Sequence, residues 1–531
     1  MIKTLAKAQQ QERVKFRVPR SVQDAIPIRR IWSDGIFLCG NQYSKTWSFT
    51  DINYAIAGKD DKTAMFLDYS ELLNALDSGA SAKITLCNRR VNKAEFERSV
   101  LLPMKGDTLD EYRREFNEML LAQTAGSNSI VRERYLTVSV VKRSIDEARA
   151  YFARVGTDLV THFAALSSVA AELPVNDRLR IFRDFFKVGQ EPAFEFNIAE
   201  NAKRGQHFKD WLCPDSMEFA ADHFKLDARY GRVLYLQDYA SYIKDSFVSE
   251  LCDLDRDLML SIDILPVPTD EAARQLQSTL LGVETNVANW QRRQNANNNF
   301  AATIPYDMEL QRKETKEMLD DLTTRDQRMM FGLVTLVHLA DSKEQLDSDT
   351  ETLYSTARKH LCQLSMLRWQ QKDGLDTVLP YGLRKIQALR TLTTESTAVL
   401  IPFRAQEIMQ PNGLYYGQNA VSKNMIVADR RLLLNGNSFR LGVSGSGKSM
   451  SAKEEIVQIA LSTEDDILIL DPESEFGYLT EALGGEVIRI SATSDTHINA
   501  LDMDRAYGDE RNPIVSKSEF VLSLFEQLIG D

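Results

Sequence analysis

A run of eight residues constrains the fold of this chain more than any other stretch. Residues 442–449 read Gly-Val-Ser-Gly-Ser-Gly-Lys-Ser and fit the phosphate-binding pattern GxxxxGK[ST] at every position. Such a loop joins the end of a strand to the start of a helix. "SFRLGV" before it reads as a strand, and "KSMSAKEEIVQIALS" after it reads as a helix. The motif therefore predicts an α/β nucleotide-binding domain.

The residue types of the loop suit ATP and Mg²⁺, which we predict as cofactors. The glycines let successive N–H groups turn inward toward phosphate oxygens. Lys448 is expected to reach the β- and γ-phosphates, and the Ser449 hydroxyl is the predicted metal ligand. The alternative is a glycine-rich turn with no ligand. The predicted nucleotide site comprises Gly442, Val443, Ser444, Gly445, Ser446, Gly447, Lys448, Ser449 and Met450.

An acidic cluster follows the next apolar run. "ILIL" at 467–470 is typical of a parallel strand covered on both faces, and Asp471, Glu473 and Glu475 come directly after it. Ligands bind at that edge of an open parallel sheet, so we predict Glu475, together with Lys448, as a catalytic residue. For Asp471 two interpretations stay open, a site carboxylate or a cap of the turn with Pro472.

A complete P-loop ATPase also needs a second apolar strand that ends in Asp or Asp-Glu. After Lys448 the apolar strand that ends in Asp is "ILILD", which directly follows the P-loop helix. We therefore expect the ATPase domain to be incomplete at its C-terminal end, and we leave open whether the chain hydrolyses ATP alone.

Three domains are expected along the chain. Residues 1–210 alternate strands and helices, as a mixed α/β domain does, and a similar cadence returns over 211–395, a second α/β domain. Residues 396–531 begin the P-loop domain, with a parallel sheet and flanking helices. Strands are predicted over 35–39, 83–87, 135–141, 232–239, 258–267, 329–340 and 362–370.

Composition places the chain among cytoplasmic proteins. The five cysteines are scattered and form no CxxC pair, which favours buried thiols over a disulfide framework or a zinc site. No run approaches the ~20 apolar residues that cross a bilayer. The basic residues 1–20 read as a solvated arm or as a peripheral contact with an anionic membrane. The net charge of −12 disfavours a broad DNA-binding surface and leaves a local basic channel open.

The C-terminal motifs carry a family resemblance. "NGNSFRLGVSGSGKSMSAKEEI", "DILILDPESEFGYLTEALGGEVIRIS" and "HINALDM" together resemble the VirB4-like ATPases of conjugative type IV secretion systems, in the form found on mobile elements of Gram-positive bacteria. The family phrase Asp-Pro-Glu-x-Glu-aromatic corresponds here to residues 471–476. Ala500 stands where the family usually has proline, and the family's downstream strand and arginine motifs have no counterpart.

The resemblance implies a RecA-like motor, often hexameric, that docks on other secretion-system components at the cytoplasmic face of the membrane. ATP turnover there drives channel or pilus assembly or DNA–protein transfer. Two other functions stay open. One is a HerA/FtsK-like DNA translocase, and the other is a hydrolysis-deficient scaffold subunit.

Overall fold

The computed structural model describes residues 19–90, 100–125, 130–189, 196–240, 242–297, 303–410, 412–491, 493–497, 499–502 and 513–530. The chain forms two compact units. The first comprises Met1–Leu101 and Asn117–Leu434, and the second comprises Leu102–Phe116 and Asn435–Asp531.

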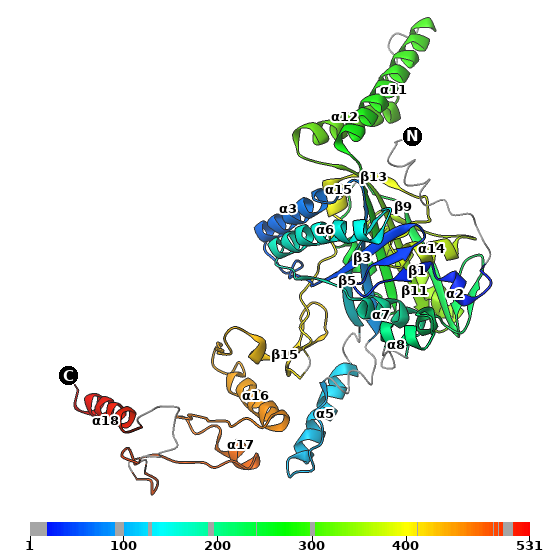
Figure 1. Ribbon diagram of the computed structural model, residues 1–531. Helices are drawn as coiled ribbons and strands as arrows, with labels where there is room; N and C mark the ends of the chain where they lie inside the picture. Colours follow the sequence, from blue (N-terminus) through cyan, green and yellow to red (C-terminus); the bar gives the residue numbers. More distant parts are fainter. Residues whose placement is uncertain are drawn as a thin grey trace. The chain divides into compact units, whose positions relative to one another are not determined.

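The described residues of the first unit form a thirteen-stranded sheet in which the paired strands run antiparallel (Figure 1). The strands along its main path, in spatial order, are β1 (Ile28–Ile31), β2 (Phe37–Cys39), β3 (Gln42–Phe49), β5 (Ile130–Val140), β4 (Ser81–Arg90), β10 (Leu258–Pro266), β11 (Met329–Ala340), β9 (Arg229–Asp238), β8 (Phe224–Leu226) and β7 (Met217–Phe219). Beside this path, β6 (Ala170–Glu172) pairs with β3, β12 (Gln363–Met366) with β9 and β13 (Arg390–Thr393) with β11. The mixed α/β class predicted for this region is confirmed.

The sheet consists of two halves with the same connectivity. The order β1-β2-β3-β5-β4 of the first half returns as β7-β8-β9-β11-β10 in the second, and β6 on β3 corresponds to β12 on β9. The connecting helices correspond as well: α3 (Lys59–Asn74) to α10 (Phe247–Leu251), α6 (Ile145–Ala165) to α13 (Lys343–Lys359), and α7 (Val175–Phe186) to α14 (Gln371–Val378). The cadence that the sequence shows twice is therefore a structural repeat.

Local capping signals repeat with the topology. Ser144 before α6 and Ser342 before α13 have the same backbone angles, φ −137° and ψ 164°. Each hydroxyl accepts a hydrogen bond at 3.2 Å from the backbone N–H three residues on, that of Glu147 or Gln345. A serine N-cap of this kind satisfies one of the free N–H groups that begin a helix.

The two halves meet where β4 pairs with β10. Thr85 faces Ser261 in the register, and their hydroxyl oxygens lie 2.8 Å apart. Two residues away, Lys83 forms a buried ion pair with Asp263 at 3.1 Å. The segments predicted as separate domains, 1–210 and 211–395, thus each supply one half of a single sheet.

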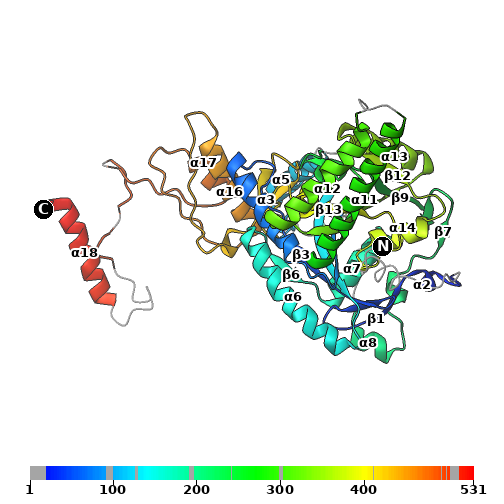
Figure 2. The ribbon, with the colours of Figure 1, turned by 90° about the horizontal axis from the view of Figure 1, so that it is seen from above.

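Helices cover both faces of the sheet. On one face α3 and α6 lie side by side (Figures 1 and 2), and their apolar residues join those of α10, α13 and α15 (Thr394–Ala398) in one core. On the other face α7, α14 and α9 (Lys209–Leu212) form a second core. Along β11, for example, Val334 and Leu336 join the first core, and Leu333 and Val337 join the second.

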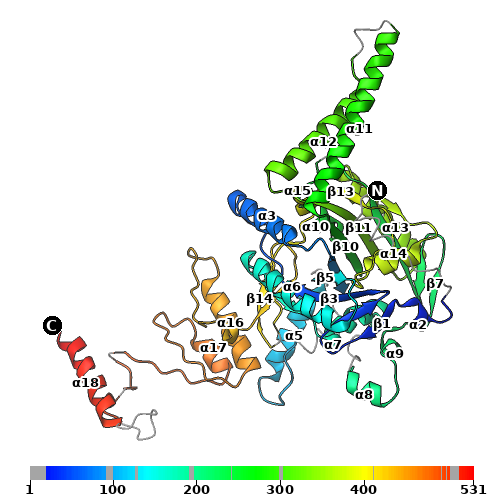
Figure 3. The ribbon, with the colours of Figure 1, turned by 45° about the horizontal axis from the view of Figure 1, so that its top comes forward.

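A long helical hairpin and several short elements complete the first unit. A helical hairpin of α11 (Thr269–Ala296) and α12 (Tyr306–Thr324) projects from the sheet (Figure 3), with Arg312 of α12 2.9 Å from Glu284 of α11. The remaining elements are α2 (Val22–Ala25), α8 (Ile198–Lys203), the strand pair β14 (Leu414–Gln418) and β15 (Met425–Ala428), and the 3₁₀ turn η2 (Arg430–Leu432).

The cysteines are thiols, as predicted. Cys39, Cys87, Cys252 and Cys362 are buried, and Cys213 is half-buried. Burial raises the pKa of Cys252 and of Cys213 to about 11. These side chains are therefore protonated packing residues at neutral pH rather than reactive thiolates.

The described part of the second unit combines helices with turns and irregular segments. It contains α16 (Lys448–Ser462), α17 (Gly477–Ala482), α18 (Pro513–Ile529) and the beginning of α5 (Asp110–Ala125), a helix that continues into the first unit. None of its described segments forms a hydrogen-bonded strand, so the strands expected at 438–443, 467–470 and 486–491 are not formed. Leu468 and Leu470 are each 89% exposed. A buried parallel strand needs both of its faces covered, whereas these two leucines are exposed. The described residues therefore do not confirm the parallel sheet that was predicted for this domain.

Candidate nucleotide-binding site

Two glycines of the predicted loop hold backbone conformations that other residues adopt rarely. Gly445 and Gly447 have φ angles of 77° and 88°, in the left-handed region. A Cβ atom at Gly442 would lie 2.4 Å from the Ser446 hydroxyl oxygen. The backbone turns back on itself at this point, because the Ser446 N–H donates to the carbonyl of Val443 at 3.2 Å. This turn is the local geometry that the motif predicts.

Lys448 lies at the head of the helix that follows the loop. α16 begins at Lys448 with Gly447 as its N-cap, and its first turn contains no acidic residue. The Lys448 ammonium donates to the carbonyls of Gly442 at 2.9 Å and Val443 at 3.1 Å. The lysine thus closes the loop on itself. Its positive charge adds to that of the helix N-terminus, which makes this end of α16 suitable for an anion.

The other predicted loop residues lie around the same turn. Ser444 and Met450 are exposed, and Ser449, the expected Mg²⁺ ligand, is half-buried in the first turn of α16. Arg440, just before the loop, donates to the Ser451 hydroxyl at 3.0 Å and forms an ion pair with the buried Glu455. This brace ties the chain entering the loop to the helix leaving it.

The acidic cluster after residue 470 divides into a structural residue and exposed ones. The Asp471 carboxylate accepts the backbone N–H of Phe476 at 2.8 Å, and this bond is the main reason that its pKa lies below the ordinary value. Asp471 therefore caps the turn, which is one of the two interpretations that the sequence left open. Glu475 is exposed, and in the described part of the chain it forms no hydrogen bond or ion pair with the phosphate-binding loop.

A distant segment holds the far end of the P-loop helix. Arg113, which is 1% exposed, donates through Nε to the carbonyl of Leu461 at 3.0 Å. Its other nitrogens bind Asp107 and Asp110, and hydrogen bonds from Arg113 are the main cause of the lowered pKa of Asp107. Lys105 adds an ion pair with Glu464 at 2.6 Å. Cations at a helix C-terminus satisfy its last carbonyls and oppose its dipole.

Sequence reasoning did not predict this anchor. The predicted N-terminal domain, 1–210, includes residues 102–116, whereas in the structure these residues belong to the compact unit that contains the P-loop. The nearest signal is the acidic-basic run "DTLDEYRRE", which is equally typical of a solvated helix. A contact between residues more than 340 positions apart leaves no local pattern in one sequence.

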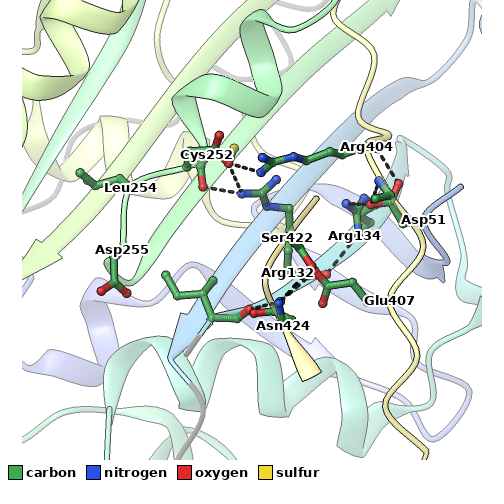
Figure 4. Close-up of a pocket in the computed structure, with 13 residues that line it drawn as sticks. Asp51, Arg132, Arg134, Cys252, Leu254, Asp255, Arg404, Glu407, Ser422 and Asn424 are labelled. Atoms are coloured by element: carbon green, nitrogen blue, oxygen red, sulfur yellow. Dashed lines mark hydrogen bonds and ion pairs between the residues drawn. The ribbon is translucent and has the colours of Figure 1, made fainter. Parts of the chain in front are cut away.

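A second polar site lies in the first unit, where three arginines surround a pocket of about 30 Å³ (Figure 4). Arg134 of β5 forms an ion pair with Asp51 and donates to the carbonyl of Pro402 at 2.9 Å. Asp51 also accepts the backbone N–H groups of Arg404 at 2.7 Å and Ala405 at 3.1 Å. Burial raises the pKa of Asp51, and Arg134 opposes that rise.

The other two arginines of the pocket converge on the loop after α10. Arg132 donates to the Cys252 carbonyl and to Asn88, and Arg404 forms an ion pair with Asp253. Each guanidinium is thus matched by carboxylates or carbonyls, and a pocket of this volume holds about one water molecule. The geometry suits an anchor for the chain segment 402–407 rather than a ligand site.

Compared with models of known protein families, the sequence matches none, and it matches no curated protein either. In the part of the chain that the structure describes, no helix has the length and apolarity to cross a bilayer. Nor does any group of three histidine, cysteine or acidic side chains there have the arrangement of a metal site. Most of the basic arm predicted over 1–20 lies outside the described residues, as do Ile498 and Met503 of the "HINALDM" phrase.

Proposed function

We propose that this chain is an ATP-binding motor subunit of a conjugative type IV secretion system, similar to the VirB4-like ATPases. The observation that carries the nucleotide-binding part is the loop 442–449. Gly445 and Gly447 hold the left-handed backbone angles with which such a loop turns its N–H groups inward, and Lys448 lies at the positive end of α16. The secretion-system assignment rests on the motif resemblance.

When ATP binds, we expect the loop to exchange hydrogen bonds within itself for hydrogen bonds to the nucleotide. Bound ATP supplies a phosphoanhydride bond whose cleavage drives motion. Lys448 exchanges the carbonyls of Gly442 and Val443 for phosphate oxygens, which are stronger acceptors because they are charged. The loop N–H groups and the N-terminus of α16 hold the same anion, and the Ser449 hydroxyl is the proposed Mg²⁺ ligand.

A scaffold subunit that binds ATP without hydrolysing it is the second candidate function. The position of Glu475 favours it, because that carboxylate is exposed and makes no bond with the loop in the described residues. On this alternative the nucleotide stabilises the second unit and a partner performs the turnover. The proposed assignment to a secretion system, whether as motor or as scaffold, also includes homo-oligomerisation, docking on other secretion components and a peripheral membrane location.

Fluorescent ATP titrated into the purified chain tests the proposal. Charge-assisted hydrogen bonds contribute about 1.5–3 kcal/mol, so Lys448→Ala should weaken binding roughly 10- to 100-fold. Lys453→Ala is the matched control, because it removes the same charge one turn further along α16 and should bind as the wild type does. Equal affinity in both variants would refute the site.

The rate of phosphate release from the same samples separates the two functions. Turnover by the wild type, lost in Lys448→Ala, supports the motor. Mg²⁺-dependent binding with no turnover supports the scaffold. Salt-sensitive DNA binding that stimulates turnover would instead favour a DNA translocase.

A further inference from the structure

The strand β12 (Gln363–Met366) lies at an edge of the sheet of the first unit. It pairs with β9, and in the described part of the chain it has no second partner strand. An antiparallel strand directs half of its N–H and C=O groups away from its neighbour. An uncovered edge therefore offers backbone hydrogen bonds to another extended chain.

Two large apolar residues flank this edge in strained backbone conformations. Leu361 has a φ of 56° and Trp369 a φ of 61°, and each side chain is 83% exposed. The left-handed region is unfavourable for residues with a Cβ atom, and exposed apolar side chains give no packing energy in return. The contacts of the described residues therefore give no stabilising reason for a leucine and a tryptophan at these two positions.

The repeat supplies an internal comparison. Leu361 is the second residue after α13, and the corresponding residue after α6 is Ser167, with a φ of 60°. The fold requires the left-handed turn in both halves. It does not require a large apolar residue there, because the first half uses a serine.

A groove beside β12 defines the chemistry of a partner. It has a volume of about 860 Å³ and is lined by Leu361, Met366, Tyr235 and Tyr354 together with Arg358 and Arg368. Asp238 is the acidic side chain among the lining residues. The lining therefore combines apolar surface with a net positive charge, which complements an apolar segment that carries carboxylates.

We propose that β12 with Leu361 and Trp369 is a docking edge for an extended, acidic segment of a partner protein, which adds to the sheet as a further strand. Backbone hydrogen bonds to β12 hold the segment, and alternate apolar side chains contact the groove. This surface is independent of the nucleotide site, so it stands whether or not the chain hydrolyses ATP.

A fluorescein-labelled peptide, TEVEVTVE, is the probe, and fluorescence anisotropy with the full chain is the assay. The proposal predicts saturable binding that is at least tenfold weaker for TEVPVTVE, whose proline removes a strand N–H, and for the basic TKVKVTVK. Binding of all three peptides with equal affinity, or of none of them, would overturn it.

Glycine variants separate docking from folding. Leu361→Gly and Trp369→Gly should each weaken peptide binding at least fivefold, while their thermal midpoints equal or exceed that of the wild type because the strain is relieved. Ser167→Gly relieves the same strain in the other half and should leave peptide binding unchanged. A lowered midpoint with unchanged peptide affinity would assign Leu361 a structural role and overturn the proposal. So would a dimer of this chain that Leu361→Gly dissociates, because a second copy would then occupy the edge.

Discussion

Replacing Lys83 by Met tests how the two halves of the sheet are joined. The Lys83 ammonium is buried and donates to Asp263 and to the carbonyl of Leu383, both at 3.1 Å, and also to the carbonyl of Thr377. Methionine keeps most of the side-chain volume and removes the charge. Asp263, 3% exposed, then loses its ion-pair partner.

The expected loss of stability arises because a buried charge without a partner is strongly unfavourable. Removing one member of a buried ion pair destabilises a protein by about 3–5 kcal/mol. The first unit contains about 420 residues, and unfolding entropy is roughly 2.1 cal/mol/K per residue, which gives about 0.9 kcal/mol per degree. The thermal midpoint of Lys83→Met should therefore fall by about 3–6 °C.

Differential scanning calorimetry at two pH values measures this effect. Burial raises the pKa of the Asp263 carboxyl, and Lys83 opposes that rise. Without Lys83 the pKa rises further, so the penalty is absent below the ordinary pKa of about 4 and grows as the pH increases. The gap between Lys83→Met and the wild type should be smaller at pH 5 than at pH 8. The double variant Lys83→Met, Asp263→Val should recover most of the midpoint. A gap under 1 °C that neither depends on pH nor closes in the double variant would refute the reasoning.

Three further predictions concern a cap, a buried histidine and the anchor of the P-loop helix. Ser342→Ala removes the hydroxyl that caps α13 and should cost about 1 kcal/mol, or about 1 °C in the same scans; an unchanged midpoint would contradict it. Burial lowers the pKa of His338 to about 3, so the wild type should lose stability as the pH falls from about 6.5 toward 3. His338→Gln should lose less stability over the same range, and parallel profiles of thermal midpoint against pH would contradict this. Arg113→Leu leaves the Leu461 carbonyl without its donor, so hydrogen exchange of the amides over 455–462, measured by mass spectrometry, should accelerate about tenfold. Arg113→Lys should show an intermediate rate, and identical exchange in the wild type and both variants would disprove the anchor.

Local signals made much of the first unit predictable. β11 spans 329–340 as predicted, because ten of its twelve residues are apolar or β-branched, and all twelve are buried. The predicted strands at 83–87 and 258–267 correspond to β4 and β10. Their pairing across the middle of the sheet, with Thr85 opposite Ser261, joins positions 176 residues apart and has no local signature.

The phosphate-binding loop was predictable because its chemistry is contained in eight adjacent residues. Gly445 and Gly447 adopt the left-handed angles that only glycine takes easily, and Lys448 begins a helix where the pattern places it. The surroundings were not predictable. Arg113 precedes Leu461 by 348 positions in the chain, and the exposed position of Glu475 depends on how the loop after residue 470 folds.

The edge strand β12, which pairs with β9 alone among the described strands, shows a further limit of prediction from the sequence. "CQLSMLRWQ" predicts a strand there, and β12 forms within it. The left-handed angles of Leu361 and Trp369 come from the turns at either end, and no residue preference predicts them, since leucine and tryptophan disfavour such angles.

Isothermal titration calorimetry of the full chain with ATP tests the central claim, nucleotide binding by the loop 442–449, most directly. We predict binding of one ATP per chain in the presence of Mg²⁺, weakened by EDTA and weakened at least tenfold in Lys448→Ala. Heats indistinguishable from dilution in the wild type, or the same affinity with and without the Lys448 ammonium, would contradict it.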